Sequence, residues 1–263
     1  MKNVNNFDGN ITVERRTKII EKLNKDGKVK VSDLSKLFNV SEVTIRNDLD
    51  QLEKKNLLVR AHGGAMKFQR AGIDYELDIK AKKNQIQKNA IGKVAAQLIK
   101  DGDTIIIDSG TTTLEITKNL HGFSNLTVIT NSLNIAGQLV EYPKIKVIML
   151  GGILRRKSLS LVGINAIESL KKYYCDKVFM GVDGIDSEYG ISTPNVDEAF
   201  LNNIMINNSR EIIVVTDSSK FKNRSFSYIA PIQKITTIVT DENIPKDEKE
   251  KIENLGINLL IAK

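Results

Sequence analysis

The chain has 263 residues, and its 39 Lys and Arg against 32 Asp and Glu give a formal net charge of +7 at pH 7. Hydrophobic residues make up 41% of it, enough for a substantial core, while the longest apolar runs are too short to span a bilayer. The single Cys175 excludes an internal disulfide, and no apolar signal segment follows Met1. We therefore expect a soluble, cytoplasmic protein of one large or two ordinary domains.

The excess positive charge lies near the N-terminus. Residues 1–70 hold 15 basic and 9 acidic side chains, whereas residues 71–263 hold 24 and 23. A small basic domain beside a nearly neutral one is typical of a protein in which one part binds a polyanion. The alternative is a basic surface that only improves solubility.

The first quarter of the chain predicts a short helical domain. Residues 1–11 lack periodicity and are expected to form a flexible tail, and apolar residues at helical spacing predict a helix over 13–24. The next pattern predicts two helices joined by a sharp turn at Asn39, a residue that tolerates the left-handed conformation. Ser41 is then a suitable N-cap for the second helix. This arrangement is typical of a helix-turn-helix.

The second helix of the pair has an apolar face and a polar face that is free to enter a major groove. Arg46 suits guanine and Asn47 suits adenine, while Ser and Thr hydroxyls near the helix start suit phosphate. A hairpin that follows predicts a wing whose basic side chains reach phosphates. The predicted DNA contacts are Ser41, Glu42, Val43, Thr44, Arg46, Asn47, Lys54, Arg60 and His62. The alternative is an ordinary helical hairpin inside a larger fold.

Residues 12–68 are thus predicted to form a winged helix-turn-helix domain, 69–85 a polar linker, and 86–263 an α/β domain. After a helix over 86–99, strands are predicted at 104–108, 126–130, 146–150, 177–180, 211–216, 235–240 and 257–261. Continuous Ile and Val runs indicate strands that are covered on both faces. Helical segments between them indicate βαβ crossovers and a mainly parallel sheet.

In such sheets ligands bind beyond the carboxyl ends of the strands, so the polar loops there form the candidate effector site. The run from Asp108 to Thr113 combines hydroxyls, a glycine and the start of a helix, which favours an anion such as phosphate. An ordinary turn capped by Ser and Thr is the alternative. The predicted effector-binding residues are Asp108, Ser109, Gly110, Thr111, Thr112, Thr113, Thr130, Asn131, Gly151, Gly152, Arg155, Gly181, Asp183, Asp186, Glu198 and Lys220.

Both parts of the chain resemble one family. The run VSDLSKLFNVSEVTIRNDLDQLEKKNLLVRAHGGA resembles the N-terminal domain of the DeoR family of bacterial transcriptional regulators, although many members have a second Arg where this chain has Asn47. The runs IIIDSGTTTLEI, VITNSLNIA, MLGGILRR, FMGVDGID and IIVVTDSSKF resemble the effector domain of that family, whose fold is similar to sugar-phosphate isomerases and coenzyme A transferases. Within the family, the DSGTTT, TIRNDL and GGILRR runs most resemble repressors of N-acetylgalactosamine utilisation.

The resemblance implies a repressor of a sugar or amino-sugar operon that binds operator DNA as a homodimer or homotetramer and is released by a phosphorylated sugar. Activation instead of repression is one alternative. Another is a sugar-phosphate isomerase or deaminase with an appended DNA-binding module, which would use Asp183, Asp186 or Glu198 as a base. The sequence has no Walker loop, zinc spacing or Ser-His-Asp set, so we expect no catalytic residue, metal, cofactor or membrane partner.

Overall fold

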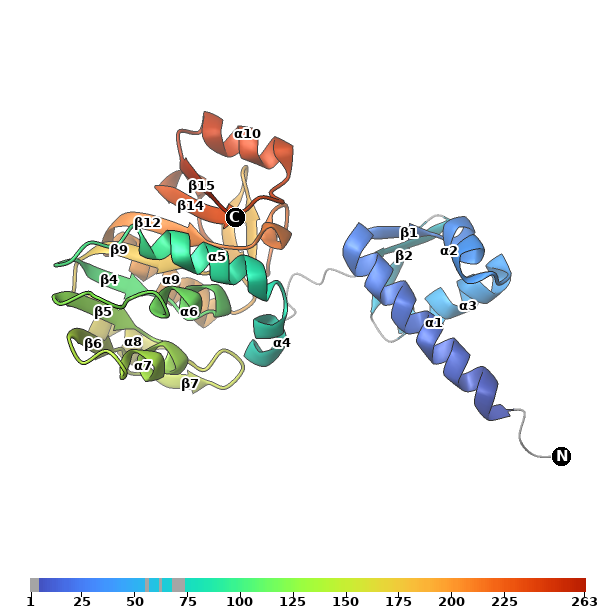
Figure 1. Cartoon of the computed structure of the whole chain (residues 1–263), viewed down its shortest axis with the longest axis horizontal. Helices are drawn as coiled ribbons and strands as arrows, with labels where there is room; N and C mark the ends of the chain where they lie inside the picture. The colour runs from blue at the N-terminus through green and yellow to red at the C-terminus, as the bar shows by residue number, and fades with distance from the viewer. Residues whose placement is uncertain (1–4, 55–56, 62, 68–73) are drawn as a thin grey trace. The chain divides into compact units, whose positions relative to one another are not determined.

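The computed structural model describes residues 5–54, 57–61, 63–67 and 74–263, and the chain divides into two compact units, 1–70 and 71–263 (Figure 1). The described elements of the first unit are α1 (Asn5–Asp26), β1 (Lys28–Lys30), α2 (Val31–Phe38), α3 (Glu42–Lys54), β2 (Leu58–Ala61) and β3 (Gly64–Lys67). The three strands form an antiparallel sheet in the order β1-β3-β2. Helices α2 and α3 with the β2–β3 hairpin make the predicted winged helix-turn-helix.

The core of this unit combines an apolar stripe on each helix with buried residues of the three strands. Ile19 of α1, Leu34 of α2 and Ile45 of α3 are all completely buried in one cluster. Between the helices Asn39 takes the left-handed conformation, with φ 50° and ψ 47°. The Ser41 side chain then caps α3, because its Oγ accepts a hydrogen bond of 3.1 Å from the backbone N–H of Thr44. The predicted turn and cap are confirmed.

Helix α1 differs from the expectation of a flexible tail over residues 1–11. It begins at Asn5, so the structure places residues 5–11 in the first turns of the helix. Extending a helix that has already formed costs less than starting one, and residues 5–11 contain no proline to stop it. The apolar pattern that begins at Val13 marks where the helix meets the core and not where it starts.

Within residues 74–263, all of which are described, a seven-stranded parallel sheet has the order β15-β14-β12-β9-β4-β5-β6. Its strands are β4 (Thr104–Ile107), β5 (Leu126–Thr130), β6 (Ile145–Met149), β9 (Cys175–Met180), β12 (Ser209–Val215), β14 (Thr237–Asp241) and β15 (Asn258–Ala262). All seven predicted strands are confirmed, each with its start within two residues of the prediction. The helices of this unit are α4 (Leu77–Lys82), α5 (Gln85–Ala96), α6 (Thr111–Thr117), α7 (Leu133–Leu139), α8 (Ile164–Leu170), α9 (Val196–Asn207), α10 (Lys246–Asn254) and the short 3₁₀ turns η1 (Ser218–Lys220) and η2 (Ile232–Lys234).

Helices cover both faces of this sheet (Figure 1). Side chains alternate along each strand, so Ile105 and Ile107 of β4 pack in one cluster with α5, α6 and α7. Ile106 faces the other way and packs in a second cluster with α8 and α9. This double covering explains the continuous apolar runs in the sequence, and it leaves the carboxyl ends of the strands as the edge where polar loops gather.

Several short elements were not predicted from the sequence. The hairpin of β7 (Ile153–Arg155) and β8 (Ser160–Val162) follows β6, and a small antiparallel sheet joins β10 (Gly184–Asp186), β11 (Gly190–Thr193) and β13 (Ser227–Ala230). Helix α4 lies inside the segment expected to be a plain linker. These elements have three to six residues each, too few for a periodic pattern to stand out. No helix in the described ranges is long and apolar enough to cross a membrane.

Candidate DNA-binding face and effector site

Helix α3 presents the predicted polar face to solvent. Val43 is 62% exposed, and Arg46 and Asn47 are exposed beside it, while Ile45 on the opposite face is fully buried. The Arg46 guanidinium pairs with the carboxylate of Glu42 one turn earlier, with 2.6 Å between Nη2 and Oε2. This pair is exposed, so it is weak and costs little to exchange for a base or phosphate contact.

The inner side of α3 carries a buried carboxylate that is not among the predicted DNA contacts. Asp48 is 1% exposed and accepts hydrogen bonds from Nε of Arg15, at 2.6 Å, and from Nε of Arg16, at 2.7 Å. Both arginines belong to α1. Two of the basic side chains that contribute to the N-terminal charge excess therefore hold α1 and α3 together.

The wing residues differ in how freely they are available. Lys54 is exposed at the end of α3. The Arg60 guanidinium pairs with Asp50 at 3.1 Å, and the Arg60 backbone N–H donates to Glu53. His62, a predicted phosphate contact, lies outside the described residues.

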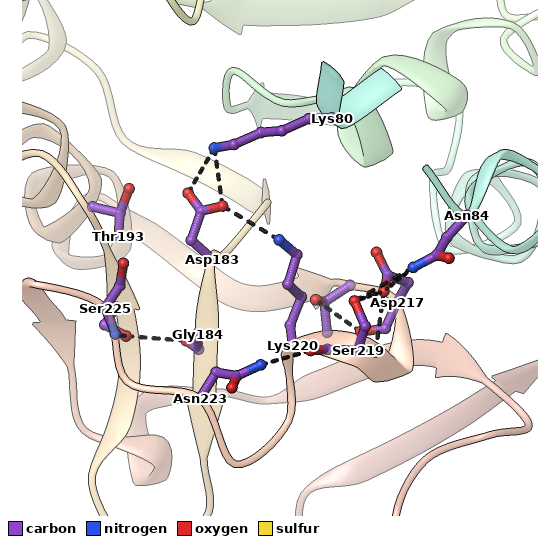
Figure 2. A network of polar contacts seen from close by, with 12 residues as sticks. Lys80, Asn84, Asp183, Gly184, Thr193, Asp217, Ser219, Lys220, Asn223 and Ser225 are labelled. Carbon is purple, nitrogen blue, oxygen red and sulfur yellow. Dashed lines mark hydrogen bonds and ion pairs between the residues drawn. The ribbon is translucent and has the colours of Figure 1, made fainter. Parts of the chain in front are cut away.

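The predicted effector loops meet at the carboxyl edge of the large sheet, where one carboxylate binds two lysines. Asp183, which follows β9, lies 2.9 Å from Nζ of Lys80 on α4 and 3.4 Å from Nζ of Lys220 in the loop after β12 (Figure 2). Burial alone would raise the pKa of Asp183, but the two ammonium groups hold that pKa below its usual value. Lys80 lies in the segment expected to be a linker and is not among the predicted effector-binding residues.

Lys88 is a third lysine at this edge, and it too was missed. It is 4% exposed, on α5, and its ammonium donates a 2.5 Å hydrogen bond to the backbone carbonyl of Lys80. Burial lowers the pKa of Lys88 to about 8, with Asp217 acting in the opposite direction. The spacing along α5 could have indicated this position in the sequence. Lys88 lies three residues before the core residue Ile91 and therefore falls on the buried side of an amphipathic helix.

A second polar group lies around Arg155 of the β7–β8 hairpin. Its guanidinium pairs with the carboxylates of Asp74 and of Glu198 on α9. The Glu198 carboxylate also accepts hydrogen bonds from the hydroxyls of Ser160 and Thr193. Arg155 and Glu198, which are 43 residues apart and both among the predicted effector-binding residues, therefore lie in contact.

Asp108 at the end of β4 lies close to this second group. It is 2% exposed, and burial, with the neighbouring charge of Glu198, raises its pKa well above the usual value. The side-chain amide of Asn202 on α9 lies 3.4 Å from Asp108 Oδ2. Asp108 is thus a buried carboxyl at the end of β4, near the charge of Glu198.

Much of the threonine-rich run is engaged in holding the loops themselves. The Thr113 hydroxyl donates to the Gly110 carbonyl, the Thr130 hydroxyl donates to the Ile107 carbonyl, and Asn131 accepts from the N–H of Ser109. Those groups have little capacity left for a ligand. The partly exposed members of the run are Ser109, Gly110 and Thr111, while Thr112 is 8% exposed.

Two of the predicted glycines, Gly152 and Gly181, lie close to neighbouring segments, and the predicted carboxylate Asp186 binds elsewhere. A Cβ on Gly181 would lie 3.7 Å from Thr113, so the loop after β9 lies against the loop after β4. Gly152 has φ 133°, and a Cβ there would lie 2.4 Å from the Val162 carbonyl, whereas one on Gly151 would meet no atom within 4 Å. The partners of Asp186 are the N–H groups of the β10–β11 turn and Arg224, so the structure does not bring it to the lysines.

Comparison with known proteins matches each of the two compact units to a family domain. Residues 15–70 match the DeoR-like helix-turn-helix domain, and residues 83–242 match the DeoR C terminal sensor domain. A protein of Escherichia coli O157:H7 named for repression of the aga operon is 43% identical over 253 residues, covering 95% of this chain and 94% of that one. The regulator YulB of Bacillus subtilis is 40% identical over 249 residues, covering 95% and 96%.

Among solved structures, a ribose 5-phosphate isomerase of Methanocaldococcus jannaschii covers 53% of this chain and 55% of its own, at 20% identity and a TM-score of 0.40. The two domain matches and the full-length relatives cover both units of the chain. The chain therefore belongs to the DeoR family of transcriptional regulators.

Proposed function

We propose that the chain represses a sugar or amino-sugar utilisation operon, binding operator DNA through α3 and the wing until a phosphorylated sugar binds at the carboxyl edge of the large sheet. The observation that carries the effector part is the buried Lys88, which lies with Lys80 and Lys220 where the fold gathers its polar loops. A buried ammonium whose printed hydrogen bond within the described residues goes to a neutral backbone carbonyl gains stability from an added anion. The phosphate group supplies that anion.

The sugar end of the effector fits the second polar group. Arg155, Glu198 and Asn202 offer donors and acceptors in a small space next to the buried Asp108. Hydroxyl groups of a sugar need both kinds of partner. The names of relatives that refer to sugar operons, including the aga operon, support a sugar or amino sugar as the ligand class.

Tight binding to operator DNA requires more than one copy of the chain. A single recognition helix reads few base pairs, and paired half-sites on DNA are the usual source of sufficient affinity. We therefore propose a homodimer or homotetramer that acts in the cytoplasm. Release requires that the effector prefers the conformation that binds DNA poorly, since equal preference would shift nothing.

A ligand screen tests the effector site directly. We would measure thermal shifts with glucose 6-phosphate, N-acetylgalactosamine 6-phosphate, galactosamine 6-phosphate and inorganic phosphate, because a ligand that prefers the folded state raises its stability. Lys88→Gln and Lys220→Gln should abolish the shift, whereas Lys93→Gln, an exposed lysine on the same helix as Lys88, should retain it. Loss of the shift in all three variants, or in none, would contradict the assigned site.

The enzyme alternative is tested with the same compounds. Asp183 is a poor general base at neutral pH because its two lysine partners lower its pKa. We expect no isomerisation or deamination of the sugar phosphates by the purified chain. Turnover that Asp183→Asn abolishes would establish the enzyme instead.

A further inference from the structure

Helix α4 and the residues before it, 74–82, contact the rest of the sensor unit through several polar groups. No residue of α4 is buried, and Ile79 is 57% exposed. At one end Asp74 pairs with Arg155, and its carbonyl accepts from Lys157. At the other end Lys80 pairs with Asp183, as Figure 2 shows. We name this segment, residues 74–82, the strap.

The groups that hold the strap are the groups assigned to the effector site. Arg155 pairs with Asp74, Asp183 pairs with Lys80, and Lys88 donates to the Lys80 carbonyl. One further bond, from the Leu77 N–H to the Lys157 carbonyl, joins the strap to the β7–β8 hairpin. An anion that bound Lys88 and Lys80 would replace the contacts that hold one end of the strap. A ligand that bound Arg155 would replace the contact that holds the other end.

The strap has a natural hinge at its downstream end. Lys83 is extended, and Asn84 takes the left-handed conformation with φ 55°, which separates α4 from α5. Asn84 is itself fixed, because its amide donates a 2.8 Å hydrogen bond to Asp217 (Figure 2). Residues after Asn84 therefore stay with the sheet, while residues before it are free to leave once their ion pairs are broken.

We propose that the strap is the element through which effector binding reaches the DNA-binding domain: the ligand displaces the strap by competing for its anchors, and the chain between the two domains lengthens. This inference rests on the proposed function. Nine released residues add up to about 30 Å of extended chain, so each DNA-binding domain can move through a much larger volume around its half-site. A longer tether lowers the effective concentration of the second DNA-binding domain at its half-site, and operator affinity falls.

The first test needs no ligand. Asp74→Asn removes the ion pair with Arg155 and loosens the upstream end of the strap, so amide hydrogen exchange of residues 74–82 should become faster in the full-length chain. Binding to a duplex selected from a random-sequence pool should weaken by about 5- to 150-fold, the usual range for coupling between two sites. Asp78→Asn, the same substitution at an exposed position of α4, should change neither the exchange rate nor the affinity for the duplex. Asp74→Glu, which keeps the negative charge, should behave like the wild-type chain in both measurements.

The second test uses ligands. Addition of glucose 6-phosphate or N-acetylgalactosamine 6-phosphate, whichever raises the melting temperature, should speed exchange in residues 74–82 of the wild-type chain. Slower or unchanged exchange with the ligand bound would overturn the strap proposal and leave the effector site intact. If neither compound binds, the effector assignment fails, and Asp74→Asn alone tests the strap. The strap proposal is then overturned if Asp74→Asn matches Asp78→Asn in hydrogen exchange and in affinity for the duplex.

Discussion

Arg15 donates from its Nε to the carboxylate of Asp48 at 2.6 Å, which joins the first helix of the DNA-binding domain to the inner side of the recognition helix. Arg16 contributes a second bond to the same carboxylate. Because Asp48 is adjacent to Asn47 in the sequence, this contact fixes the rotation of α3 about its axis. It thereby determines which side chains face solvent and are available to DNA.

Asp48→Asn should destabilise the DNA-binding domain by about 3 kcal/mol, because it leaves two partly buried guanidinium groups without their counter-charge. Urea unfolding followed by circular dichroism measures the change. Asp50→Asn is the matched control on the same helix, since its pair with Arg60 is half exposed and should be worth less than about 1 kcal/mol. Equal losses in the two variants would show that the buried pair has no special role.

The strands of the sensor domain could be predicted from the sequence because their signal is local. Runs such as Ile105 to Ile107 indicate a strand that is buried on both faces of a parallel sheet. The polar residues that follow such runs indicate the carboxyl edge of the sheet. The helix-turn-helix is local in the same sense, with Asn39 at the turn and Ser41 at the cap. In both cases a short stretch of chain carries the physical cause.

The rest of the site could not be predicted because its contacts are not local. Lys80 and Asp183 are 103 residues apart, and nothing in the polar run around Lys80 distinguishes it from a solvated linker. Conversely, Asp186 lies in the same loop motif as Asp183 but turns into the β10–β11 hairpin. Spacing identified which loops meet, whereas only the fold determines which side chains in them face one another.

For DNA, Arg46→Ala should cost about 1 to 3 kcal/mol at the selected duplex and reduce discrimination against altered sites. Lys54→Ala should weaken binding to all sequences alike. It should also reduce the slope of log affinity against log salt concentration by about one. Fluorescence anisotropy at several salt concentrations, with the selected and a scrambled duplex, separates the two effects. Identical behaviour of the two variants would show that α3 does not read bases through Arg46.

Two glycines of the sensor domain should respond to alanine in opposite directions. A Cβ on Gly92 would lie 2.6 Å from the backbone of Glu115, so α5 and α6 must move apart, at a cost of about 1 to 3 kcal/mol. Gly137 lies in α7, and a Cβ there meets no atom within 4 Å, so alanine should stabilise by about 0.5 to 1 kcal/mol. Thermal unfolding of both variants tests the close crossing of α5 and α6.

The titration of Lys88 gives the effector site a characteristic pH dependence. Its pKa is about 8 in the folded chain against a usual value of 10.5, and Asp217, Lys220, Lys80 and Glu115 all act on it alongside burial. A bound phosphate ester requires the charged form of Lys88, so affinity should be steady from about pH 7, where the ester is mostly a dianion, to pH 8, and fall by up to about tenfold per unit above it. Calorimetry with glucose 6-phosphate or N-acetylgalactosamine 6-phosphate, which carry no amine, measures this fall.

The stability of the ligand-free chain should change in the opposite direction over the same range. Between about pH 8 and 10.5 the unfolded chain binds one more proton at Lys88 than the folded chain does, so this residue makes stability rise with pH. Lys88→Gln removes both effects: it should bind the ester weakly at pH 7, with no further loss near pH 8, and lack this rise in stability. A variant that kept the wild-type pH profile of binding would exclude Lys88 as the phosphate partner.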